Sequence, residues 1–73
     1  MQPQQLVDMA NQIGQYFDSL PERREALSEF AQHLINFWAP TMRQALLSHM
    51  DTEQVSDLTP LVVEALIQHR HRL

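Results

Sequence analysis

The sequence predicts an all-α fold, a small bundle of three to four short helices that forms a single helical domain over residues 1–73. Apolar residues recur at three- and four-residue spacing along most of the chain, as on the buried faces of helices. The prolines stand at positions where helices can begin. A chain of this length buries only about 60% of the surface of its unfolded form, which leaves no interior volume for a walled catalytic pocket.

We expect helices over approximately residues 4–18, 20–38, 40–50 and 60–71. In the first, Gly14 and Ala10 offer a flat spot for the close approach of another helix, although a merely tolerated glycine is an equal alternative. The apolar face of this first helix comprises Leu6, Met9, Ala10, Ile13, Tyr16 and Phe17.

The second helix has a start signal in the segment Ser19-Leu20-Pro21-Glu22. Ser19 can cap the helix, Glu22 can complete a capping box, and Pro21 suits the first turn. Two groups of residues then lie on opposite sides of this helix. The apolar face comprises Leu27, Phe30, Ala31, Leu34 and Trp38, and the solvated face comprises Glu22, Glu25, Glu29, Gln32 and Asn36.

Prolines also mark the third and fourth helices. Pro40 opens the third, residues 51–57 form a polar linker, and Thr59-Pro60 opens the fourth. The third helix carries Met42, Ala45, Leu46 and His49 on one face, and the fourth carries Leu61, Val62, Ala65, Leu66 and His69. Val63 and Ile67 point the other way, which indicates either scattered surface residues or an interface.

Composition excludes several classes of protein. The chain has no cysteine, so thiolate ligands for zinc or iron–sulfur clusters are absent. A net charge of −4, with no lysine, disfavours nucleic acid as a partner. Apolar runs are far shorter than a membrane span, so no membrane association is expected. The residues after Met1 lack the features of a signal peptide, and we expect a cytoplasmic location.

No catalytic, cofactor-binding or metal-ligating residues are expected. The four histidines are His33, His49, His69 and His71, and no pair of them is spaced four residues apart on one helix. Ser28 and Ser48 lie inside helices rather than on the strained turn of a nucleophile. With one glycine in the chain, a phosphate-binding loop is absent.

Protein binding is the remaining class of function. The segment from Phe37 to Arg43 is rich in the residue types enriched at interfaces, although Trp38 also continues the apolar face of the second helix, which favours a place in the core. The partner-interface candidates are Phe37, Trp38, Pro40, Met42, Arg43, Leu61, Val63 and Ile67. A self-associating helical regulatory module is the alternative, and a helix-turn-helix DNA binder is disfavoured by the charge.

Three segments carry a resemblance to a known family. The residues that carry it are Met9 to Ile13, then His33, Leu34, Phe37, Trp38, Pro40, Met42 and Arg43, and then Leu58, Pro60, Leu61, Val62, Glu64, Ala65 and Leu66. In this order they resemble the delta subunit of cytoplasmic NAD-dependent formate dehydrogenases. Family members often carry an acidic residue where this chain has Ala39, so the cap of the third helix should be weaker by about 1 kcal/mol.

The resemblance implies a non-catalytic accessory subunit that supports assembly, stability or cofactor loading. The partners implied are the alpha subunit and, after it, the beta and gamma subunits. Those larger subunits would carry bis-molybdopterin guanine dinucleotide, iron–sulfur clusters and FMN, and would reduce NAD, whereas this chain would hold no cofactor.

Overall fold

The computed structural model describes residues 2–52 and 57–73. Four α-helices follow one another along the chain: α1 (Pro3–Asp18), α2 (Arg23–Phe37), α3 (Pro40–Thr52) and α4 (Pro60–Gln68). A short 3-10 helix, η2 (Arg70–Arg72), follows α4, and the described residues include no strand. The predicted all-α fold is therefore confirmed.

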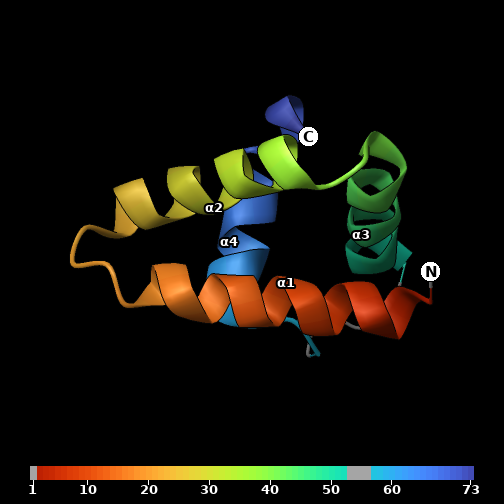
Figure 1. Ribbon diagram of the computed structural model, residues 1–73, viewed down its shortest axis with the longest axis horizontal. Helices are drawn as coiled ribbons and strands as arrows, with labels where there is room; N and C mark the ends of the chain where they lie inside the picture. The colour runs from red at the N-terminus through yellow and green to blue at the C-terminus, as the bar shows by residue number, and fades with distance from the viewer. Residues whose placement is uncertain (1, 53–56) are drawn as a thin grey trace.

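Helices α1 and α2 form an antiparallel hairpin, and α4 crosses behind both of them (Figure 1). Helix α3 stands at the end of the hairpin where α1 begins. A single apolar core lies among the four helices, and its largest fully buried side chains are Val7, Phe30, Leu34, Leu46, Leu61, Val62 and Leu66. None of the described helices combines the length and the apolar character needed to cross a bilayer.

Gly14 is the point of closest approach between α1 and α4. A Cβ atom added there would lie 2.9 Å from Cγ2 of Val62 and 3.4 Å from Cδ2 of Leu61. The flat spot expected at this glycine is therefore occupied by α4, and glycine is required for the packing. Tyr16, expected on the buried face of the first helix, is instead 69% exposed, because the core-facing arc is centred on Ala10 and Phe17.

The predicted start of the second helix is wrong by three residues. Ser19 Oγ donates a hydrogen bond to the carbonyl oxygen of Tyr16 at 2.6 Å, so this hydroxyl satisfies the end of α1 rather than capping α2. Glu22 is the N-cap, and its Oε1 accepts from the Arg24 backbone N–H at 3.1 Å. Pro21 therefore lies in the turn before α2 and not in its first helical turn.

Helix α3 begins at Pro40, as predicted, and extends two residues beyond the expected end, to Thr52. The Ala39 carbonyl accepts from the backbone N–H groups of Met42 and Arg43, so it starts the helix without a side-chain cap. The buried residues of α3 are Leu46, Leu47 and Met50, so the predicted face is rotated, with Ala45 exposed. Part of the linker predicted over 51–57, residues 53–56, lies outside the described residues.

Helix α4 begins at Pro60 with Thr59 at the N-cap position, as the sequence predicts, but the Thr59 side chain makes no capping hydrogen bond. It ends as an α-helix at Gln68 rather than continuing to residue 71. The Arg72 N–H donates to the His69 carbonyl and the Leu73 N–H to that of Arg70, and these bonds form the turn of η2. The predicted core face of α4 is confirmed for Leu61, Val62, Ala65 and Leu66.

Candidate docking surface

The eight interface candidates do not share one environment. Phe37 is 73% exposed and Ile67 is 62% exposed, and Pro40 is also exposed. Val63, Met42 and Arg43 are half-buried. Two other candidates belong to the core instead, because Trp38 is 5% exposed and Leu61, which faces Gly14, is 2% exposed. As folded, those two side chains offer no surface to a partner.

A row of four rings crosses from α1 to α2. Tyr16 packs edge-on against Phe17 with ring centroids 5.0 Å apart, and Phe17 packs against His33 at 5.9 Å. His33 in turn lies 4.8 Å from Phe37, with its ring tilted by 40°. Phe17 also meets Phe30 at 6.4 Å, which ties the row to the core. The exposed ring of Tyr16 thus packs against the buried Phe17, and the exposed ring of Phe37 packs against the half-buried His33.

We call the surface around this row the aromatic face. It consists of Tyr16, His33 and Phe37 from the row and of Met9 and Ile13, two half-buried apolar residues of α1. Met9, Ile13 and Tyr16 share one stripe of α1 because they are spaced by four and three residues. At 100° per residue this stripe points well away from Gly14, the residue of α1 that meets α4. This stripe therefore lies on the side of α1 that is turned away from α4.

The aromatic face has an acidic edge along α2. Glu25, Glu29, His33 and Phe37 follow one another at four-residue intervals and so form one ridge of the helix. Both carboxylates are exposed, and neither takes part in an ion pair among the described residues. We call this row, from Glu25 to Phe37, the α2 ridge. It has two negative charges at one end and an exposed aromatic ring at the other.

Most of the arginines are already engaged elsewhere. Arg23 forms ion pairs with Asp18, at 2.5 Å, and with Glu64 of α4, and these hydrogen bonds raise its pKa. Arg70 pairs with Asp51, and its hydrogen bond lowers the pKa of that carboxyl. Arg72 donates to Gln32 at 2.8 Å. In the described structure, none of these three arginines forms an ion pair with Glu25 or Glu29.

The outer side of α4 is a smaller second candidate. Val63 and Ile67 are four residues apart and point away from Val62 and Ala65, which face the core. Ile67 is largely exposed, whereas Val63 packs partly against the core. This surface offers one large exposed side chain, compared with two on the aromatic face.

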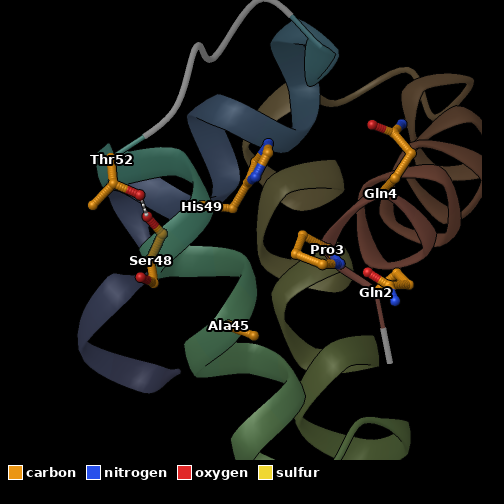
Figure 2. A pocket seen from close by; sticks show the side chains of 7 residues that line it. All are labelled: Gln2, Pro3, Gln4, Ala45, Ser48, His49 and Thr52. Carbon is orange, nitrogen blue, oxygen red and sulfur yellow. Dashed lines mark hydrogen bonds between the residues drawn. The ribbon is translucent and has the colours of Figure 1, made fainter.

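An open cleft lies between the start of α1 and α3, lined by Gln2, Pro3, Gln4, Ala45, Ser48, His49 and Thr52 (Figure 2). His49 Nε2 lies 2.9 Å from Oδ2 of Asp57. Thr52 Oγ1 donates to the Ser48 carbonyl at 2.7 Å, and the His49 ring points away from the Ser48 hydroxyl. The cleft therefore contains a histidine that pairs with a carboxylate outside the cleft lining, and it does not bring that histidine to its serine.

The C-terminal histidines are surrounded by positive charge. Burial lowers the pKa of His69, and the nearby Arg72 and His71 lower it further. Arg72 Nη1 lies 3.2 Å from His69 Nδ1. Within residues 2–52 and 57–73, no three histidine or carboxylate side chains are grouped to hold a metal ion.

Asn11 is the residue whose role the sequence analysis missed. Its Nδ2 donates to the carbonyl oxygen of Asp57 at 2.8 Å, and its Oδ1 accepts from the Thr59 backbone N–H at 3.1 Å. The Asn11 side chain thus joins α1 to the backbone that immediately precedes α4. Asn11 belongs to the first segment of the family resemblance, and the structure gives it an architectural role.

Comparisons with known proteins place these features in a family. The model of the family described as NADH-dependent formate dehydrogenase delta subunit, FdsD, matches residues 5–66 of the 73. No curated protein and no solved structure matches the chain. The matched segment includes all of α2 and α3, all five residues of the aromatic face, and most of α4.

Proposed function

The chain belongs to the family of NADH-dependent formate dehydrogenase delta subunits, and on this premise we propose that it is a non-catalytic accessory subunit that docks onto a larger subunit of the enzyme. We propose the aromatic face as the docking surface and the alpha subunit as the first partner, in a cytoplasmic complex. Docking would support assembly, stability or cofactor loading of the enzyme.

The exposure of Tyr16 and Phe37 carries this proposal. Each ring exposes more than two thirds of its surface, although the chain has enough core to bury Phe17, Phe30 and Trp38 almost completely. Large aromatic side chains at the centre of an interface contribute much of its binding energy. Because ring contacts hold Tyr16 and Phe37 in place before binding, little conformational entropy is lost when a partner covers them.

We propose that the redox cofactors of the complex are held by the larger subunits. Iron–sulfur clusters need thiolate ligands as a rule, and this chain has no cysteine to provide them. The described surface also lacks a glycine-rich loop for the phosphates of a pterin dinucleotide or flavin, since Gly14 is packed against α4. The contribution of this chain would therefore come through contact with another subunit.

Co-purification from cells that express all subunits, with an affinity tag on the alpha subunit, tests the docking surface. The double variant Tyr16→Ser/Phe37→Ser should remove most of the delta chain from the purified enzyme. Ile67→Ser is the matched control, because it truncates an equally exposed side chain on the outer side of α4. Circular dichroism of each isolated variant should show an unchanged helical signal.

Two outcomes would contradict the docking surface. One is full retention of the Tyr16→Ser/Phe37→Ser variant. The other is loss of the Ile67→Ser variant alone, which would move the interface to α4. Formate oxidation and molybdenum content, compared with and without the delta chain, test the supporting role, and equal values would refute it.

Self-association through the same face is the alternative. Light scattering of the isolated chain separates the two ideas. We expect a monomer, because each copy has a net charge of −4 and two copies repel at low salt. A tight dimer that Phe37→Ser dissociates would favour the regulatory module instead.

A further inference from the structure

The acidic edge of the aromatic face indicates the chemistry of its partner. We propose that the aromatic face receives an amphipathic helix of the larger subunit, whose apolar side covers Tyr16 and Phe37 and whose arginine or lysine side chains lie along Glu25 and Glu29. This inference rests on the proposed function, because it names the occupant of the same surface.

The row of residues along α2 joins the two kinds of contact, one helical turn after another. Glu29 precedes His33 by four residues and Phe37 by eight, so the carboxylates and the exposed ring lie on one ridge. A segment that follows this ridge meets the apolar end and the acidic end in turn. In an amphipathic helix, apolar anchors every three to four residues with charged residues along one edge provide this pattern.

The negative charge of Glu25 and Glu29 favours a partner with basic side chains. Glu25 and Glu29 are exposed and form no ion pair within the described part of the chain. A partner that covers Phe37 and continues along the α2 ridge takes these carboxylates partly out of water, which is unfavourable unless a cation comes with the partner. An acidic or neutral helix would leave both charges uncompensated. Basic side chains on the partner therefore fit this edge.

A second copy of this chain fits the edge poorly. Two of its five arginines, Arg23 and Arg70, are committed to ion pairs, and Arg72 hydrogen-bonds to Gln32. The other two, Arg24 and Arg43, lie on different helices and form no basic row. The aromatic face of a second copy would instead present its own Glu25 and Glu29. The occupant that charge favours is thus another chain.

The dissociation constant between the delta chain and an enzyme purified without it, measured at 50 mM and at 500 mM NaCl, tests this proposal. Glu25→Gln/Glu29→Gln should weaken binding about five- to tenfold at the lower salt concentration and less than about twofold at the higher one, where exposed charges are screened. The control is Asp8→Asn/Asp51→Asn, which changes the net charge equally but on α1 and α3; because Asp51 pairs with Arg70, circular dichroism must first show that this control keeps its helical signal. The control should stay within about twofold of the unaltered chain.

The aromatic double variant separates this inference from the proposed function. Suppose that Tyr16→Ser/Phe37→Ser abolishes binding while Glu25→Gln/Glu29→Gln has no more effect than its control. The proposal of a basic partner is then overturned, and the proposal of the aromatic face as the docking surface stands. A glutamate effect that is equal at both salt concentrations would also overturn the basic partner. Unchanged binding of the aromatic variant would overturn both proposals.

Discussion

Gly14 of α1 lies directly beneath Val62 of α4, so close that a Cβ atom at Gly14 would be 2.9 Å from Cγ2 of the valine. The contact is closer than two carbon atoms tolerate, and valine in a helix has nearly one side-chain rotamer with which to respond. Glycine in the middle of a helix costs about 1 kcal/mol relative to alanine, so this close contact accounts for a residue that helix propensity disfavours.

Gly14→Ala should lower the free energy of unfolding by about 1 kcal/mol, because the cost of overpacking exceeds the gain in helix propensity. Urea denaturation followed by circular dichroism measures this change. In a Val62→Ala background the methyl group that clashes is gone, and the same substitution should become neutral or stabilising. A stabilising effect of Gly14→Ala in the unaltered chain would contradict the close contact between α1 and α4.

Asn11 should tolerate no change that removes its donor. Asn11→Asp keeps an oxygen for the Thr59 N–H, but it cannot donate to the Asp57 carbonyl and places a negative charge beside it. We expect a loss of about 1–2 kcal/mol in stability, typical of a hydrogen-bonded group left without its partner. Gln12→Glu, at the exposed neighbouring position, is the control and should change stability by less than about 0.5 kcal/mol. Equal losses in both variants would mean that the added negative charge on α1 lowers the stability, and not the loss of the hydrogen bond from Asn11 to the Asp57 carbonyl.

Phe37 and Trp38 should differ greatly in how much stability their truncation costs. Trp38→Ala empties a core position and should cost about 3–5 kcal/mol, a large part of the stability of a small domain. Phe37→Ala removes a ring that is 73% exposed and should change stability by about 0.5 kcal/mol or less. Thermal melts of the two variants provide the measurement. A comparable loss in both would mean that Phe37 supports the fold rather than binding.

How far the sequence predicts this structure depends on how sharply each helix face is defined. The apolar positions of α2 from Leu27 to Leu34 recur so regularly that its core face follows from spacing alone. In α3 two adjacent leucines, Leu46 and Leu47, allow two orientations, and the tertiary packing selects the one that also buries Met50. The start of α2 was misplaced because a serine between two helices can serve either of them.

The proposed docking surface is only partly accessible to sequence reasoning. Phe37 and Trp38 are adjacent and differ by 100° in direction, and the place of each relative to the core depends on how α2 packs on α4. The row through Tyr16 and His33 joins residues from two helices, so no local pattern reveals it. The four-residue spacing of His33 and Phe37 was the available signal.

Stability should fall in mild acid because of His69. Its folded-state pKa lies below the ordinary value of 6.5, mainly through burial, with Arg72 and His71 adding positive charge. The unfolded chain therefore binds a proton at His69 more readily than the folded chain does. The contribution of neutral His69 to the free energy of unfolding is complete above pH 6.5 and is lost as the pH falls through the lower folded-state pKa. Denaturation at several pH values should show a smaller decline in His69→Gln. Identical declines would remove His69 as the cause.

The most direct test of the central claim is hydroxyl-radical footprinting of Tyr16 and Phe37 in the isolated chain and in the assembled formate dehydrogenase. Both rings are exposed in the isolated chain, so their oxidation should be rapid. If the aromatic face is the docking surface, both rates should fall several-fold in the complex, and the rate at Ile67 should change little. Unchanged oxidation of Tyr16 and Phe37 in an intact complex would contradict it.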